Sequence, residues 1–181
     1  MKIVDPVDPR LTLLRARVRD VPDFPKPGIL FRDLTPLMGD GAALRLCVEM
    51  LVEKIARHRP EAIVAIESRG FIFGAPVAAA LGIGFAPVRK PGKLPHRTNR
   101  RTYELEYGTD SLEMHADAVG EGTSVVIVDD LLATGGTAAA TVELVREVGA
   151  RVAGVAVVVE LELLKGRARL DGIPVDSLLS Y

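Results

Sequence analysis

The sequence predicts an α/β fold in which helices flank a doubly wound, mostly parallel sheet. Two apolar runs, residues 62–66 (AIVAI) and 125–128 (VVIV), lack the alternation of a half-exposed strand and indicate strands buried on both faces. Helical patterns separate these strands, and the right-handed crossover rule then places helices on both faces of the sheet. The length of 181 residues, 48% of them hydrophobic, suits one domain over 1–181 that buries a sizeable core.

The N-terminal part contains two predicted helices with a proline-rich segment between them. Asp8 and Pro9 are typical of the N-cap and first residue of a helix, which we expect to run through about Val18. The next segment, residues 20–36, contains four prolines and indicates an extended, semi-rigid crossing rather than a regular element. Asp40 is predicted to cap the second helix, whose apolar residues repeat at helical spacing as far as Arg59.

The rest of the chain alternates predicted strands and helices, without an internal repeat or a linker. Alternation around a glycine-containing turn predicts one hairpin. In chain order the expected elements are a strand over 62–66, a helix over 71–82, a strand over 83–90, a hairpin of 102–108 and 110–117, a strand over 125–128, a helix that begins near 138, and a strand over 151–161.

Composition excludes several classes of protein. The lone cysteine, Cys47, leaves no disulfide framework or cysteine-based zinc site, and its helical position favours a small buried hydrophobe over a reactive thiol. No apolar run approaches the length of a membrane span, and the N-terminus is unlike a signal peptide, so we expect a cytoplasmic protein without a membrane partner. A net charge of −1 argues against a general nucleic-acid binder.

Two segments at predicted strand ends, where ligands of such sheets bind, carry cations. Ser68-Arg69-Gly70 places a cation and backbone donors at a helix start, although an arginine paired with a surface carboxylate is an equal alternative. Residues 89–103 form a long, unpatterned loop whose six cations repel one another unless a polyanion binds, with a solvated basic loop as the alternative. These cations are Arg89, Lys90, Lys93, Arg97, Arg100 and Arg101. Nucleic acid fits this loop less well, because aromatic residues for base stacking are few.

A third segment, VVIVDDLLATGGT (125–137), follows a buried strand with two carboxylates and a turn of small residues before a helix. Backbone N–H groups at such a turn bind phosphate, and the missing Gly-Lys-[Ser/Thr] excludes the Walker P-loop. Asp129 and Asp130 could hold a divalent metal or accept hydrogen bonds from vicinal hydroxyls beside the phosphate. With a diphosphate on the cations, the predicted ligand is a ribose phosphorylated at both ends.

This third segment resembles the signature of the type I phosphoribosyltransferases, which use 5-phosphoribosyl-1-pyrophosphate (PRPP). Other segments, in the same order and spacing, resemble the adenine phosphoribosyltransferases over nearly the whole chain: DFPKPGILFRDLTP (23–36), ESRGFIFG (67–74), VRKPGKLP (88–95), YELEYG (103–108) and ELLKGRARL (162–170). The resemblance implies a hood over about 1–36, a flexible hairpin lid over about 89–116, a homodimer, and magnesium held mainly by PRPP and water rather than directly by the protein. The implied reaction is adenine + PRPP → AMP + diphosphate, a step of purine salvage.

The resemblance also implies roles for individual residues. Glu106 would be the general acid/base on the purine, Tyr107 would help to close the lid, and Arg69 would act on the leaving diphosphate. The 5-phosphate and ribose would be held by Asp129, Asp130, Ala133, Thr134, Gly135, Gly136 and Thr137. The diphosphate would be held by Ser68, Arg69, Arg89, Lys90 and Lys93, and the adenine by Leu30, Phe31, Arg32 and Leu131. A non-proline cis peptide is expected at Glu67-Ser68.

Two alternatives stay open at this point. The chain could be a phosphoribosyltransferase for hypoxanthine, guanine or xanthine. It could also be a PRPP-sensing regulator that binds DNA, although residues 1–20 are too short to supply a helix-turn-helix.

Overall fold

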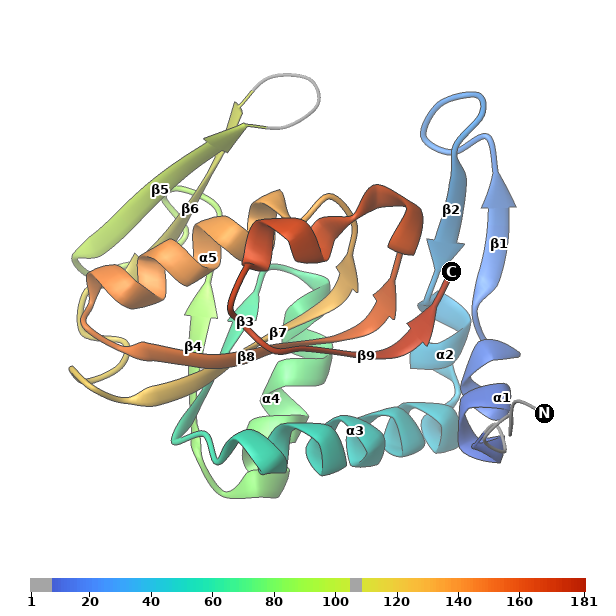
Figure 1. The fold of residues 1–181 in the computed structure, drawn as a ribbon, viewed down its shortest axis with the longest axis horizontal. Helices are drawn as coiled ribbons and strands as arrows, with labels where there is room; N and C mark the ends of the chain where they lie inside the picture. Colours follow the sequence, from blue (N-terminus) through green and yellow to red (C-terminus); the bar gives the residue numbers. More distant parts are fainter. Residues whose placement is uncertain (1–7, 105–108) are drawn as a thin grey trace. The chain divides into compact units, whose positions relative to one another are not determined.

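The structure is a computed structural model that describes residues 8–104 and 109–181 (Figure 1). The chain divides into two compact units, Met1–Met50 and Leu51–Tyr181.

The first unit contains α1 (Pro9–Arg15), a two-stranded antiparallel sheet of β1 (Arg19–Pro22) and β2 (Leu30–Asp33), α2 (Thr35–Gly39), and most of α3 (Gly41–Ile55). The Asp8 carboxylate accepts from the Arg10 N–H at 2.9 Å, which confirms the predicted N-cap. The Asp40 carboxylate likewise accepts from the Ala42 N–H at 3.0 Å at the start of α3. The helix α1 ends at Arg15, earlier than predicted.

The prediction of an extended crossing without regular elements over residues 20–36 was wrong, because this segment contains most of β1, all of β2 and the start of α2. Prolines do not prevent the β1–β2 pair, because Pro22 ends β1 and the next two prolines lie in the connecting turn. That turn reverses the chain with a cis Phe24-Pro25 bond and with positive φ angles at Asp23 (56°) and Gly28 (86°). Proline thus occupies positions that need no ladder donor, which a count of prolines alone does not reveal.

The second unit is built on a five-stranded sheet in the order β4-β3-β7-β8-β9, in which every pair is parallel. Its strands are β3 (Ala62–Ile66), β4 (Gly84–Val88), β7 (Ser124–Leu132), β8 (Arg151–Glu160) and β9 (Val175–Ser180). All five residues of β3 are buried, as the unbroken apolar run predicts. The α/β class with a parallel sheet is therefore confirmed.

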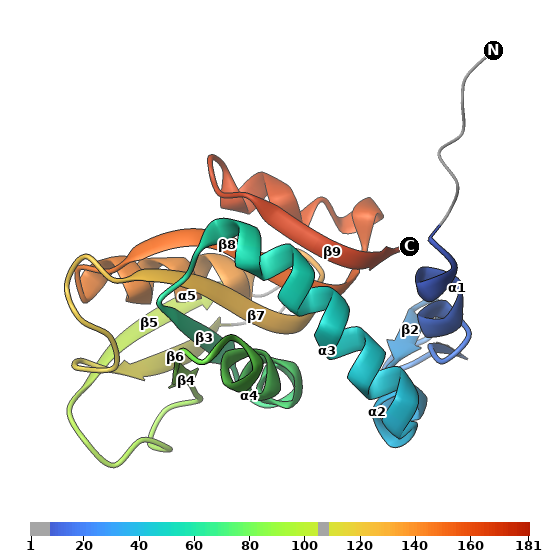
Figure 2. The ribbon, with the colours of Figure 1, turned by 90° about the horizontal axis from the view of Figure 1, so that it is seen from below.

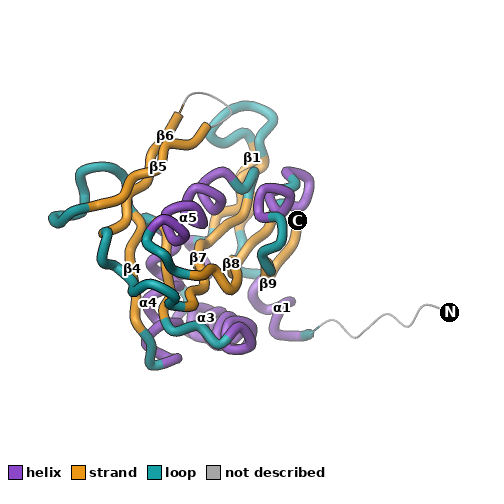
Figure 3. Tube along the Cα trace, turned by 60° about the vertical axis from the view of Figure 1, so that its left-hand side comes forward, coloured by secondary structure: helices purple, strands orange, loops and turns teal. Residues whose placement is uncertain are grey.

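Helices cover both faces of this sheet. The helix α4 (Arg69–Leu81) packs against β3 and β7 on one face, and α5 (Gly136–Glu147) packs against β7 and β8 on the other (Figures 1 and 2). The hairpin of β5 (Thr98–Glu104) and β6 (Thr109–His115) lies on α5, so that α5 is between the hairpin and the sheet (Figure 3). A short 3₁₀ helix, η1 (Ala56–His58), precedes β3, and two others, η2 (Glu162–Leu164) and η3 (Gly166–Leu170), connect β8 to β9.

One hydrophobic cluster of the second unit lies between the sheet, α5 and the hairpin. It joins buried side chains from β3, β7 and β8 to Leu144 of α5 and to Leu112 and Met114 of β6. Among the described residues, none of the helices combines the length and apolar character that crossing a bilayer requires.

Candidate active site

The site lies at the carboxyl ends of β3 and β7, which are neighbours in the sheet. From β3 the chain first forms β4 on one side and later β7 on the other, so the two loops diverge at a topological switch point. The Arg69 Nε atom, after β3, lies 2.8 Å from the Asp130 Oδ2 atom of β7. Gly70 allows this approach, because a Cβ atom there would lie 2.9 Å from both the Asp129 Oδ1 atom and the Val128 carbonyl oxygen. Two of the three predicted segments therefore meet.

The small-residue turn after β7 borders a cavity of about 80 Å³. Gly135 is the N-cap of α5 with a φ of 81°, a conformation that favours glycine. The first N–H groups of a helix have no partner within the helix, and those of α5 belong to residues that line this cavity. The lining includes every residue predicted for the 5-phosphate: Ala133, Thr134, Gly135, Gly136 and Thr137.

The 3₁₀ helix η3 supports this turn from behind. A Cβ atom on Gly166 would lie 2.3 Å from the Ala133 carbonyl oxygen, and one on Gly135 would lie 2.4 Å from the Gly166 carbonyl oxygen. Both positions therefore require glycine. Gly166 was not among the predicted site residues, since nothing in a local pattern indicates that a segment about thirty residues later touches the turn.

The two aspartates have different surroundings. Asp129 lines the cavity and its Oδ1 atom accepts from the Asp130 N–H at 2.9 Å. Burial and the adjacent Asp130 charge raise the pKa of Asp129 well above its usual value of 3.8. Burial also raises the pKa of Asp130, with Arg69 opposing that rise. The Arg69 contact has the distance of an ion pair but not the angle of a hydrogen bond, and within the described residues Asp130 Oδ2 accepts none.

The cations predicted for the diphosphate differ in how they are held. The Arg89 guanidinium binds both carboxylate oxygens of Glu67 at 3.1 Å and lowers the pKa of that carboxyl. The Lys90 N–H donates to the same carboxylate at 3.0 Å, and the Lys90 ammonium pairs with Asp110. Lys93 is exposed. The peptide bond between Glu67 and Ser68 is cis, as expected.

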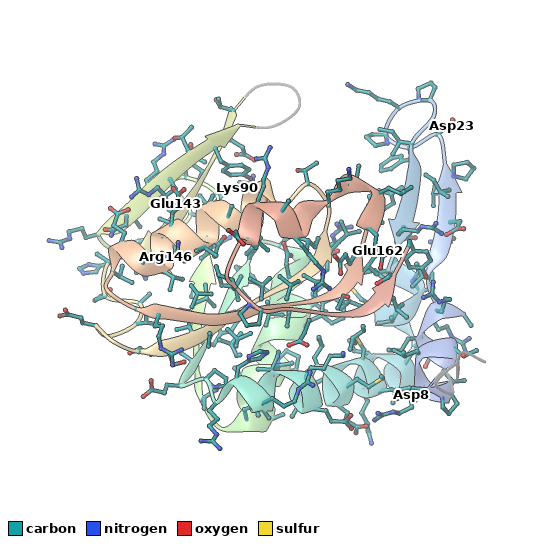
Figure 4. All side chains as sticks on the ribbon, viewed as in Figure 1. Asp8, Asp23, Lys90, Glu143, Arg146 and Glu162 are labelled. Atoms are coloured by element: carbon teal, nitrogen blue, oxygen red, sulfur yellow. The ribbon has the colours of Figure 1, made fainter. Side chains whose placement is uncertain are left out.

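The basic segment 89–103 differs in two respects from the predicted loop of unpaired cations. Its last residues are not loop, because β5 begins at Thr98. Three of its six cations also have acid partners within the protein: besides Arg89 and Lys90, Arg101 lies 3.0 Å from Glu147 and 3.6 Å from Glu143, and Figure 4 labels Glu143 on α5. Acids distant in the sequence therefore balance half of the six cations.

The residues predicted for adenine fall on two elements. Leu30, Phe31 and Arg32 lie on β2 in the first unit, where the Phe31 ring meets the Phe24 ring edge-on with the ring centroids 5.2 Å apart. Leu131 lies near the end of β7 in the second unit and lines the cavity. Glu106 and Tyr107 lie outside the described residues.

Comparisons with known proteins agree with this geometry. A family model for the phosphoribosyl transferase domain matches residues 40–175. The chain is 57% identical to the adenine phosphoribosyltransferase of Desulfitobacterium hafniense, with 91% of this chain and 95% of that protein covered. It is 56% identical to that of Methylococcus capsulatus, with 93% and 98% covered.

Solved structures give the same result. The adenine phosphoribosyltransferase of Thermoanaerobacter pseudethanolicus superposes with a TM-score of 0.92 at 51% identity, covering 94% of this chain and 99% of that one. The yeast enzyme from Saccharomyces cerevisiae, complexed with an imino-altritol bisphosphate and adenine, gives a TM-score of 0.88 at 41% identity with the same coverage. The chain belongs to the phosphoribosyltransferase family. Within that family it belongs with the adenine phosphoribosyltransferases.

Proposed function

We propose that the chain transfers the 5-phosphoribosyl group from PRPP to adenine, giving AMP and diphosphate in purine salvage. The observation that carries the proposal is the cavity at the end of β7, where a carboxylate and the N-terminus of a helix face the same small space. The adenine phosphoribosyltransferases named above support the proposal as well, because their sequences align with more than nine-tenths of this chain.

The turn would bind the 5-phosphate of PRPP through its backbone N–H groups and the Thr134 and Thr137 hydroxyls. Asp129, which lines the cavity beside the turn, would accept from a ribose hydroxyl. Asp130 would accept from the other hydroxyl once the contact with Arg69 rearranges, and its buried Oδ2 atom supports this role. This pair thereby fixes the ribose relative to its phosphate.

Breaking the bond between ribose C1 and the diphosphate builds negative charge on the leaving group, which cations stabilise. Arg69 and Ser68, at the start of α4, together with Lys93, are the groups proposed to contact it. Arg89 and Lys90 would contribute as well; like Arg69, both side chains already contact carboxylates, and these contacts would have to rearrange to admit the diphosphate.

Magnesium would arrive with PRPP as part of the substrate and neutralise the diphosphate. Across residues 8–104 and 109–181, no three His, Cys, Asp or Glu side chains gather where they could hold a metal ion. Mg²⁺ usually keeps several of its waters and binds through substrate phosphate oxygens, so PRPP and water are the ligands that we propose for it.

The base would be held by Phe31 and Leu131, with the backbone of Leu30 and Arg32 reading the edge of the ring. Glu106 would remove the proton that adenine loses, and Tyr107 would help to exclude water. We also propose a single catalytic domain with a hood over about 1–36 and a lid over about 89–116, a homodimer, and a cytoplasmic location.

The test is AMP formation from adenine and PRPP with magnesium, with hypoxanthine, guanine and xanthine as matched substrates. We expect turnover with adenine alone, because a pocket built for a 6-amino purine leaves polar groups unpaired against a 6-oxo purine. Equal turnover with hypoxanthine would refute the assignment of the base. Binding of PRPP without turnover of any purine would favour a regulator.

A further inference from the structure

A chain of hydrogen bonds joins the β5–β6 hairpin to the phosphate turn. Tyr103 and Asp110 are directly opposite in the hairpin register, and the Tyr103 hydroxyl donates to Asp110 Oδ2 at 3.3 Å. The Thr137 hydroxyl, in the first turn of α5, donates to the Tyr103 oxygen at 3.3 Å. The Lys90 ammonium pairs with the same Asp110 oxygen. Four side chains from three separate segments are thus connected.

The Tyr103 ring is fixed in place rather than free at the surface. It is partly buried and packs against the core that also contains Leu112 and Leu144. The strand that carries it, β5, packs on α5. Its hydroxyl therefore has a defined position beside Thr137.

We propose that Tyr103 is a positioning residue for the phosphate turn: its hydroxyl orients the Thr137 hydroxyl and couples phosphate binding to the hairpin. The inference rests on the phosphate site proposed above.

The reason is the number of protons available. A threonine hydroxyl has one proton to donate, and Thr137 donates it to Tyr103. A phosphate oxygen is a hydrogen-bond acceptor, and on binding it would accept the hydrogen bond that Thr137 now donates to Tyr103. Tyr103 would then turn its own O–H from Asp110 toward the Thr137 oxygen, and Asp110 would keep its bond to Lys90. Every group stays paired, and the arrangement in the hairpin depends on what the turn binds. By linkage, the hairpin arrangement must then affect phosphate affinity equally.

The test is Tyr103→Phe, which keeps the ring and removes only the hydroxyl. We expect the KM for PRPP and the Kd for ribose 5-phosphate to rise about 3- to 10-fold, the range of one neutral hydrogen bond. The KM for adenine and kcat should change little. Ribose 5-phosphate should protect residues 98–104 and 109–115 from hydrogen exchange in the wild type, and less so in the variant.

A matched control removes a hydroxyl from the adjacent residue of the same strand. The Thr102 hydroxyl contacts the Ser111 hydroxyl at 2.9 Å, so its partner lies within the hairpin itself. Thr102→Val should leave the affinity for ribose 5-phosphate unchanged. An equal loss in both variants would mean that any loosening of the hairpin weakens binding, and it would overturn the inference.

A double-mutant cycle gives the decisive measurement. The effects of Tyr103→Phe and Thr137→Val on ribose 5-phosphate affinity should not add, because the two hydroxyls act as one unit. Additive effects would overturn the inference even if AMP forms normally. Conversely, non-additive effects on ribose 5-phosphate affinity, together with a wild-type chain that forms no AMP, would support the inference and refute the proposed function.

Discussion

Replacing Gly166 by alanine tests whether η3 fixes the position of the phosphate turn. The added Cβ atom would lie 2.3 Å from the Ala133 carbonyl oxygen and 3.0 Å from Leu132 Cγ. Ordinary contact between such atoms begins near 3.4 Å, so either η3 or the turn must move by about 1 Å. A displacement of that size in a positioning element reduces kcat/KM by about 10²-fold. Strain of this kind also costs about 1–3 kcal/mol of stability.

The assay is kcat/KM for PRPP at saturating adenine, with thermal unfolding measured in parallel. Gly84→Ala on β4 is the matched control, because its Cβ atom would meet only Ala62 Cβ at an ordinary 3.7 Å. We expect the control to keep full activity. A Gly166→Ala variant with the wild-type KM for PRPP would refute the argument that this contact sets the geometry of the turn. A variant that is only less stable, with normal kinetics at low temperature, would refute it as well.

Three other changes are informative. Because burial and Asp130 raise the pKa of Asp129 above 3.8, the ionised form of Asp129 costs stability at neutral pH. Asp129→Asn should therefore raise Tm at pH 7 but not below pH 3.8, where the carboxyl is protonated in both the folded and the unfolded state. The same variant should raise the KM for PRPP about tenfold or more. Glu106→Gln should lower kcat about 10²- to 10⁴-fold while Glu104→Gln is mild, and the reverse order would show that the base is Glu104. Because Arg89 lowers the pKa of Glu67 below its usual 4.5, their pair stabilises the fold above that pH and is lost as the pH falls through the lowered value. The Tm difference between wild type and Glu67→Gln should therefore narrow under acid, and a constant difference would contradict this.

The sequence predicts most of the second unit well, because its strands are buried on both faces and have unbroken apolar runs. Residues 62–66 form β3 with the expected bounds, and the helix that was expected to end at Gly82 has that residue as its C-cap. The strand β9 was not predicted. Its polar residues Asp176 and Ser177 conceal it, because their partners lie outside the strand: His58, distant in the sequence, lies 2.6 Å from the Asp176 carboxylate, and the Arg167 guanidinium donates to the Ser177 hydroxyl at 3.3 Å.

The candidate site was predictable where one local segment builds it. The turn after β7 and its two carboxylates are contiguous in the sequence, so their nearness follows from the strand–turn–helix pattern. The contacts made by Gly166 and Tyr103 are different, because they depend on how η3 and the hairpin pack on α5. Charge balance was hard to predict for the same reason: the acids that pair with Arg101 lie more than forty residues later in the chain.

The buried thiol of Cys47 has a practical consequence for experiments that follow the β5–β6 hairpin. It is fully buried in α3, and burial raises its pKa to about 12, so almost none of it is thiolate at neutral pH. A thiol reagent can modify it only when α3 opens, and the sequence contains no second cysteine. The rate of modification therefore reports opening of the fold directly. A cysteine introduced at the exposed Arg100 could then carry a fluorescent label on the hairpin with little background from the rest of the chain.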